Sequence, residues 1–177
     1  VITAVALGAG SKELFACSES RVTFSALTAQ DIAAYVASDG EIDPSVFLAW
    51  AQQRGKTVWL PVVCDDRPLH PLGLRFVIAP TPKQRGGWRR NHYGIPEPRA
   101  RQHIAPTRLD LLLLPLVGFD DHGNRLGMGG GYYDRLLQKL EQMPRRPRYI
   151  GLAHHCQQVP RLIKAHWDQA VDDIIAV

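Results

Sequence analysis

The segment that most constrains the fold is residues 109–117, which read LDLLLLPLV and are almost wholly apolar. A strand with one face in water alternates apolar and polar residues, whereas a strand covered on both faces reads as a nearly continuous apolar run. Sheets of this kind carry helices on both faces. The segment therefore predicts a central strand of a largely parallel sheet.

The rest of the chain contains elements of two different periods. Pro44 and Ala51 bound one helical pattern, which Gly55 ends, and apolar residues recur at helical spacing again from Tyr133 to Leu140. Short apolar or β-branched runs occur at residues 32–37, 57–63, 74–79, 149–153 and 174–177. Strands that alternate with helices predict parallel pairing. We expect an α/β fold, a single three-layer α/β/α sandwich with a mostly parallel, Rossmann-like central sheet and its site at the carboxyl ends of the strands.

Length and composition favour one globular domain over residues 1–177 without a membrane span. The chain has 177 residues, of which 45% are hydrophobic and 21% charged, and no apolar run approaches the roughly 18 residues of a membrane span. The apolar residues 1–9 follow no basic region and do not resemble a secretory signal. Cys17, Cys64 and Cys156 lie far apart, which favours a reducing, cytoplasmic setting. We expect a monomer.

The net charge of +4 favours an anionic partner. Residues 83–93 are the densest basic stretch and include Arg85, Trp88 and Tyr93, a mixture that could bind RNA through phosphate contacts and stacking. The alternative interpretation is a solvated loop, because glycines and prolines in and around the stretch disfavour a regular platform. We expect a nucleotide or a polycarboxylate ligand, and no nucleic acid.

A glycine-rich stretch carries the strongest sign of a binding site. Residues 119–135 read FDDHGNRLGMGGGYYDR, leaving the predicted buried strand and entering a predicted helix. The free backbone N–H groups and the dipole of a helix N-terminus favour an anion, and glycines let the backbone approach phosphate oxygens closely. Arg125 could pair with phosphate, and Asp134 could bind Mg²⁺. Taken alone, the glycines could instead form a tight connection and Asp134 a helix cap.

The same stretch resembles the signature of the 5-formyltetrahydrofolate cyclo-ligase family, also called methenyltetrahydrofolate synthetases. The resemblance rests on the two segments PLVGFD at residues 115–120 and GNRLGMGGGYYDR at residues 123–135. Three more segments agree in order and spacing: GEIDP at residues 40–44, YGIPEP at 93–98 and HWD at 166–168 with the acidic pair at 172–173. The match runs from about residue 31 to the end of the chain.

The resemblance implies a reaction that depends on ATP and Mg²⁺. The γ-phosphoryl group of ATP passes to the formyl oxygen of 5-formyltetrahydrofolate, and the neighbouring nitrogen then closes the ring. Loss of phosphate leaves 5,10-methenyltetrahydrofolate, with ADP as the other product. Phosphoryl transfer depends mainly on positioning and charge neutralisation, which a backbone cradle, an arginine and a metal ion can supply.

The resemblance also implies roles for individual residues. Catalytic roles fall to Arg125 and Tyr133. The ATP-binding residues would be Arg125, Leu126, Gly127, Met128, Gly129, Gly130, Gly131, Tyr132 and Tyr133. The folate-binding residues would be Val36, Glu41, Met128, Gly129, Gly130, Gly131 and Tyr132. Asp134 and Asp168 would bind the metal, whereas Glu97 is a weaker site candidate and His154 and His155 receive no role.

The first thirty residues depart from the family pattern. Family members usually begin with a basic helix whose Lys and Arg reach the ATP phosphates, but here the basic residues before residue 31 are Lys12 and Arg21. Residues 1–30 are therefore interpreted as a divergent or incomplete segment. This difference leaves open a second hypothesis, a folate- or nucleotide-binding homologue without turnover.

Overall fold

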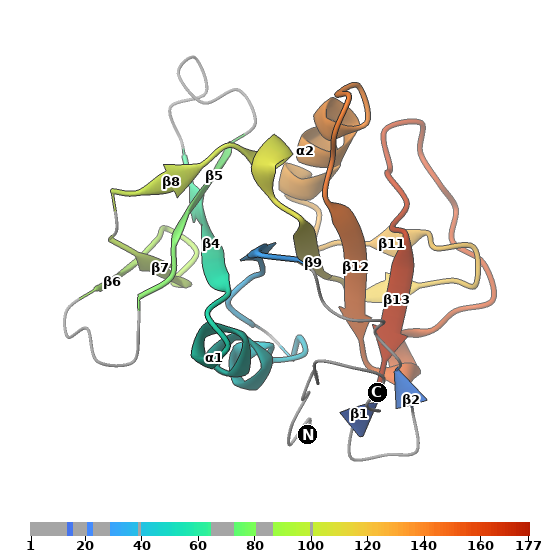
Figure 1. Cartoon of the computed structure of the whole chain (residues 1–177). Helices are drawn as coiled ribbons and strands as arrows, with labels where there is room; N and C mark the ends of the chain where they lie inside the picture. Colours follow the sequence, from blue (N-terminus) through green and yellow to red (C-terminus); the bar gives the residue numbers. More distant parts are fainter. Residues whose placement is uncertain are drawn as a thin grey trace.

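A sheet of seven strands organises the part of the chain that the structure describes (Figure 1). The computed structural model describes residues 14–15, 21–22, 29–38, 40–64, 73–80, 87–99 and 101–177. The strand order is β13-β12-β9-β3-β4-β5-β8. The strands are β3 (Asp31–Ala33), β4 (Thr57–Val63), β5 (Leu74–Ile78), β8 (His103–Ile104), β9 (Leu111–Pro115), β12 (Arg148–Ala153) and β13 (Asp173–Ala176).

The five strands from β13 to β4 run parallel, so the predicted mostly parallel sheet is confirmed. Residues 109–117 were expected to form a central strand, and β9 occupies that place between β12 and β3. Of the seven described strands, only β5 runs against the others, because it pairs antiparallel with β4 and β8 pairs antiparallel with β5. They extend one edge of the sheet in succession, and the described residues between them contain no helix of the kind a parallel crossover uses.

The two α-helices found among the described residues cover opposite faces of the sheet. Helix α1 (Ser45–Gln53) joins β3 to β4, and α2 (Tyr132–Leu140) lies between β9 and β12. The side chains of each strand alternate between the faces, since Ile32 and Leu111 belong to the α1 side whereas Ala33 and Leu112 belong to the α2 side. The connection β3-α1-β4 moves toward one edge of the sheet, and β9-α2-β12 moves toward the other. Because such crossovers are right-handed, the two helices lie on opposite faces. The result is the predicted α/β/α sandwich.

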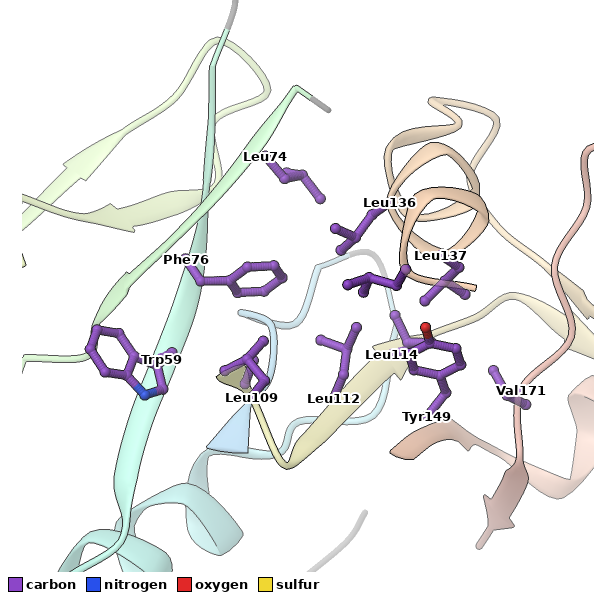
Figure 2. Packing of buried hydrophobic residues seen from close by; sticks show 12 residues of the cluster. Trp59, Leu74, Phe76, Leu109, Leu112, Leu114, Leu136, Leu137, Tyr149 and Val171 are labelled. Atoms are coloured by element: carbon purple, nitrogen blue, oxygen red, sulfur yellow. The ribbon is translucent and has the colours of Figure 1, made fainter. Parts of the chain in front are cut away.

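Leucine side chains form most of the core between α2 and the sheet (Figure 2). Leu112 and Leu114 from β9 lie opposite Leu136 and Leu137 of α2, with Phe76 to one side. Each of these side chains is completely buried. Burial of one such side chain is worth about 1.5–3 kcal/mol, so this layer holds the start of α2 firmly against β9.

Three two-stranded sheets lie outside the main sheet in the described part of the chain, and none was predicted. The first pairs β6 (Trp88–Arg90) with β7 (Pro96–Pro98), in the stretch that had been interpreted as a loop. The second pairs β10 (Gly118–Phe119) with β11 (Arg125–Leu126), directly after β9. Strands this short carry too little periodicity to be recognised in a sequence.

The remaining elements are short. The strands β1 (Leu14–Phe15) and β2 (Arg21–Val22) pair with each other, and 3₁₀ helices lie at Pro106–Arg108 and His155–Gln157. The expectations for residues 1–9, for Lys12 and for Arg85 lie outside the described residues. No helix of the described part is both long and apolar enough to cross a bilayer.

Candidate functional site

The predicted site residues gather where the strand order of the sheet changes direction. From β3 the chain passes through α1 to β4 on one side, whereas β9 lies on the other side of β3 and leads through α2 to β12. Ligands of open α/β sheets bind outside the carboxyl ends of the strands at this kind of switch point. Glu41 lies in the loop after β3, and Arg125 lies in the hairpin after β9. The topology therefore brings together residues far apart in the sequence.

The glycine-rich loop runs from residue 127 to residue 131 and leads into α2. Gly129 and Gly131 have φ angles of 83° and 63°, a left-handed conformation that glycine adopts without strain. Gly131 is the residue before the first helical turn, and no side chain caps the helix there. The first backbone N–H groups of α2 are therefore not capped by a side chain, so the phosphate cradle expected here stays a prediction. Leu126 and Met128, flanking the loop's start, expose more than half of their side chains.

A buried ion pair joins the hairpin to the helix. Nη2 of Arg125 donates to Oδ1 of Asp134 at 2.6 Å, and the Arg125 side chain is only 2% exposed. Burial lowers the pKa of Arg125, whereas the neighbouring charges of Asp134 and Asp168 raise it. The Nε atom of Arg125 is buried and has no hydrogen-bond partner among the described residues. A buried, incompletely bonded cation at a helix N-terminus is well suited to receive an anion.

Tyr133 connects this ion pair to the loop after β3. Burial raises the pKa of the Tyr133 phenol, the charge of Glu41 raises it further, and Arg125 lowers it. Tyr133 is therefore neutral at physiological pH and lies within electrostatic reach of both charged residues. Glu41 also contributes to the raised pKa of Tyr35, after burial, and its Oε2 accepts a bond from the backbone N of Ser38 at 3.0 Å. Val36, from the same loop, is half-buried and packs against the core on the α1 side.

Tyr132 extends the site in the other direction, toward the β6–β7 hairpin. Its hydroxyl lies 3.1 Å from the hydroxyl of Tyr93, and the two rings meet edge to face. Arg135 lies over the Tyr132 ring and donates to the carbonyl of Gly130 at 3.2 Å. A Cβ at Gly73 would stand 3.0 Å from the same ring. Tyr132 is thus held from three sides at the end of the glycine-rich loop.

Asp168 approaches the site from the C-terminal segment. Its charge acts on Arg125, and its Oδ2 accepts the backbone N–H of Ala165 at 2.8 Å. Asp134 and Asp168 thus both lie within electrostatic reach of one arginine. The described residues contain no cluster of three or more His, Cys, Asp or Glu side chains that could hold a metal ion by themselves. A metal ion at this place would need further ligands from substrate and water.

Glu97 has a structural role. It is 2% exposed, and its carboxylate accepts bonds from the backbone N of Val63 at 2.7 Å, from Asn91 at 3.0 Å and from Arg89 at 3.3 Å. These bonds fasten the β6–β7 hairpin to the end of β4. Arg89 belongs to the basic stretch that was considered for RNA binding. Here its side chain forms an ion pair with Glu97 within the protein.

The adjacent histidines face no group of metal ligands in the described part of the chain. The backbone N of His154 donates to Gln157, and the two residues frame the 3₁₀ helix after β12.

The sequence reasoning missed Asp120. This side chain is buried, and the hydrogen bond from the backbone of Leu162 is the largest of the influences that hold its pKa well below the usual range. The only local signal is its place before the turn Asp-His-Gly-Asn, a common setting for a carboxylate that binds turn amides. The bond to Leu162 bridges residues far apart in the chain and leaves no trace in the local sequence.

Comparisons with known proteins point in one direction. The model of the 5-formyltetrahydrofolate cyclo-ligase family matches residues 16–177. A 5-formyltetrahydrofolate cyclo-ligase from Haemophilus influenzae is 41% identical over 83% of this chain and 75% of its own length. The protein of the same name from Escherichia coli K12 is 37% identical over 79% of this chain and 74% of its own length.

Solved structures agree with this result. The 5,10-methenyltetrahydrofolate synthetase of Aquifex aeolicus is 28% identical, with a TM-score of 0.66 over 84% of this chain and 69% of that chain. The synthetase of Mycoplasma pneumoniae is 26% identical, with a TM-score of 0.61 over 84% of this chain and 73% of that chain.

Proposed function

This chain belongs to the 5-formyltetrahydrofolate cyclo-ligase family, and we propose that it converts 5-formyltetrahydrofolate to 5,10-methenyltetrahydrofolate at the expense of ATP. The observation that carries the proposal is the buried Arg125, whose Nε has no partner in the described residues and whose Nη2 binds the first-turn Asp134. This arrangement at a glycine-rich helix N-terminus suits a phosphate-bearing substrate.

The loop and the first turn of α2 would hold ATP. Backbone N–H groups at the helix start would bind phosphate oxygens, and Arg125 would add a fixed positive charge next to them. The proposed ATP-binding residues are those implied by the resemblance: Arg125, Leu126, Gly127, Met128, Gly129, Gly130, Gly131, Tyr132 and Tyr133. The two left-handed glycines support this assignment because a side chain at either position would strain the backbone.

Asp134 and Asp168 suit a magnesium ion that is shared with ATP. Mg²⁺ prefers oxygen ligands and usually binds through one or two carboxylates, with substrate phosphates and water completing the set. Each carboxylate has one oxygen in a described hydrogen bond, to Arg125 and to the backbone of Ala165 respectively. A bound Mg²⁺ would neutralise phosphate charge during the transfer.

The folate would lie on the side of the loop that faces β3. Glu41, whose charge acts on Tyr133, would accept hydrogen bonds from the pterin, and Val36 of the same loop would contribute an apolar contact. Met128, the glycines that follow it and Tyr132 would border both substrates. Tyr133 would act between them, because its neutral phenol lies within electrostatic reach of Glu41 and Arg125.

The chemistry requires positioning more than covalent participation by the protein. The formyl oxygen attacks the γ-phosphorus, the bond from that phosphorus to the bridging oxygen of ADP breaks, and ADP leaves. The N10 nitrogen then attacks the activated formyl carbon, its proton passes to the departing phosphate, and the carbon–oxygen bond breaks to release that phosphate. Arg125 would stabilise the negative charge of the transferring group, and Tyr133 could donate a hydrogen bond to an oxygen that gains charge.

We further propose that residues 1–177 act as one domain, as a monomer in the cytoplasm, with no nucleic acid or membrane partner. The internal use of Arg89 by Glu97 supports the absence of an RNA site. Gel filtration with light scattering tests the monomer, and a mass above that of one chain would contradict it.

The test is the appearance of 5,10-methenyltetrahydrofolate, followed by its near-ultraviolet absorbance. 5-Formyltetrahydrofolate, ATP and Mg²⁺ are supplied together and each is omitted in turn. We expect a signal only when all three are present. Saturable folate binding without turnover would instead favour the non-catalytic homologue.

A further inference from the structure

Asp120 is a buried carboxylate that the proposed reaction does not use. It is 1% exposed and lies just after β10, at the start of the β10–β11 turn. Its Oδ1 accepts the backbone N–H groups of His122 at 3.0 Å and Asn124 at 3.1 Å. Its Oδ2 accepts the side-chain amide of Asn124 and the backbone N–H of Leu162, both at 3.0 Å. Four donors explain how a charge can remain at so buried a position.

The bond to Leu162 anchors one end of a loop that contains Asp168. The other end is anchored to the same turn, because the backbone N of Val171 donates to the carbonyl of Gly123 at 3.0 Å. Residues 163–170 lie between these anchors and contain no helix or strand. Ile163 and Trp167 are exposed there, so little burial holds the loop in place. Its position depends mainly on its two ends.

The same turn also determines where Arg125 lies. Arg125 pairs with Phe119 across the β10–β11 hairpin, next to Asp120 in the chain. The charge of Asp168 acts on Arg125, so the loop and the hairpin meet at the proposed phosphate site. Asp120 therefore links the segment that carries one proposed metal ligand to the hairpin that carries the proposed phosphate-binding arginine.

We propose that Asp120 is a positioning residue that holds the loop of residues 163–170, and with it Asp168, in register with Arg125 for binding ATP and its metal ion. This inference rests on the proposed function. It requires the carboxylate in particular, because an asparagine offers one acceptor oxygen. Asn at this position could serve either the two turn amides or the pair formed by Leu162 and the Asn124 side chain, but not both.

Asp110, which directly precedes β9 at the amino ends of the parallel strands, provides a matched control. Oδ2 of Asp110 accepts the backbone N–H groups of Gln30 and Asp31, and its Oδ1 accepts a bond from Arg145. Desolvation raises the pKa of Asp110, but these bonds outweigh it, so the pKa is lowered, as it is for Asp120. Asp110 contacts none of the proposed site residues in these bonds. Asp110→Asn therefore removes a comparable structural carboxylate without disturbing the loop.

The first experiment follows amide hydrogen exchange by mass spectrometry without any ligand. We expect Asp120→Asn to accelerate exchange in residues 158–171 by roughly tenfold, as local opening replaces the anchored state. Asp110→Asn should accelerate exchange near residues 29–33 and leave residues 158–171 unchanged. This readout does not depend on turnover, so it tests the anchoring even if the wild-type protein proves inactive and the proposed function fails.

The second experiment measures kinetics and thermal unfolding of the same proteins. Asp120→Asn should raise the KM for ATP and the Mg²⁺ concentration for half-maximal rate by roughly tenfold or more, as expected for a residue that orients a metal ligand. The KM for 5-formyltetrahydrofolate should change less than about twofold, because the folate side is not disturbed. Asp110→Asn should lower the unfolding temperature and leave all three constants unchanged.

Unchanged ATP and Mg²⁺ constants in a folded Asp120→Asn protein would overturn the proposal and leave only a structural role. If that variant does not fold, Gly123→Ala tests the other anchor. Gly123 has a φ of 76°, and an added Cβ would stand 3.0 Å from the carbonyl oxygen of Val171. The same rise in the ATP and Mg²⁺ constants is expected, and its absence would equally contradict the proposal.

Discussion

Two arginines at opposite ends of the parallel strands differ in how completely their guanidinium groups are hydrogen-bonded. We call the two ends of these strands the amino edge and the carboxyl edge of the sheet. Arg146 precedes β12 at the amino edge, and every nitrogen of its guanidinium is bonded. It pairs with both oxygens of Asp172 at 2.7 and 2.8 Å, with Glu141 at 2.8 Å and with the carbonyl of Pro147 at 3.1 Å. Arg125 lies at the carboxyl edge, with one bond to Asp134 and a buried Nε that has no partner among the described residues.

The difference in solvent exposure makes this contrast more informative. The Arg146 side chain is 33% exposed, so water could have completed its bonds, whereas the Arg125 side chain is 2% exposed. The partly exposed Arg146, which water could serve, therefore has every guanidinium nitrogen bonded within the protein. The buried Arg125, which water cannot reach, has a nitrogen without a partner among the described residues. A buried unsatisfied donor costs about 1–3 kcal/mol, and such a cost is commonly retained where a ligand completes the bonding. This contrast is what the proposed function predicts, with ATP binding at the carboxyl ends of the parallel strands and stabilising contacts at their amino ends.

The largest effect should come from Asp134→Ala. Removing the carboxylate leaves Arg125 as an unpaired buried cation, which should lower the free energy of unfolding by about 3 kcal/mol. Turnover should fall roughly a hundredfold or more, because a charge contact to the phosphate site is also lost. Urea unfolding and the methenyl absorbance assay measure the two effects. Wild-type turnover would show that the carboxyl edge does not bind ATP as proposed.

Arg125→Met should separate function from stability. Turnover is expected to drop by roughly a hundredfold or more, as for loss of a preorganised charge. The free energy of unfolding should change by less than about 1 kcal/mol or even increase, because an apolar side chain replaces a poorly satisfied buried charge. A large loss of stability with normal turnover would show that Arg125 stabilises the fold and does not act in binding, which contradicts the contrast with Arg146.

Arg146→Met should give the opposite result. It removes several charged hydrogen bonds and the packing of the guanidinium over the Tyr149 ring, 4.5 Å from its centroid. Partial exposure screens these contacts, so the expected loss of unfolding free energy is about 1–2 kcal/mol. kcat and both KM values should stay within about twofold of wild type. A substantial rise in the KM for ATP would mean that the amino edge also contributes to binding.

The smallest effect concerns acid stability. The hydrogen bonds from Arg146 hold the pKa of Asp172 below its usual range, so the unfolded chain binds this proton more readily than the folded protein. The contribution of the pair is complete above the unfolded-state pKa of about 3.9 and is lost as the pH falls through the lower, folded-state pKa. The stability difference between wild type and Arg146→Met should therefore shrink below about pH 4. A difference that persists in acid would assign it to packing on Tyr149.

Much of the fold could be predicted from the sequence, because the central elements combine strong periodicity with length. The apolar run at residues 109–117 contains β9, and the helical spacing from Tyr133 to Leu140 lies within α2. The antiparallel pairing of β5 and β8 could not be predicted, because strand direction depends on connections that carry no periodic signal. Residue type and position likewise predicted Arg125 as a phosphate partner and Asp134 as a magnesium ligand near a helix start, and both stay predictions.

The geometry of the candidate site was less accessible. The sequence did not indicate that Arg125 would be buried and bonded to Asp134, since burial depends on neighbours from distant segments. The contact between Tyr93 and Tyr132 and the bond from Leu162 to Asp120 likewise depend on residues from distant segments. Candidate roles could be predicted for side chains within one local motif. The contacts that join distant segments became visible only in the structure.

The pairing of β3 with β9 has a consequence for how the protein is made. Ile32 lies opposite Leu111, so the middle of the sheet closes only after a long intervening segment has been synthesised. A nascent chain that has completed β3, α1 and β4 carries an open strand edge at β3, a surface that invites association with other chains until β9 covers it. Asp168 arrives later still. The sheet and the candidate binding site are therefore both completed only in the last part of synthesis.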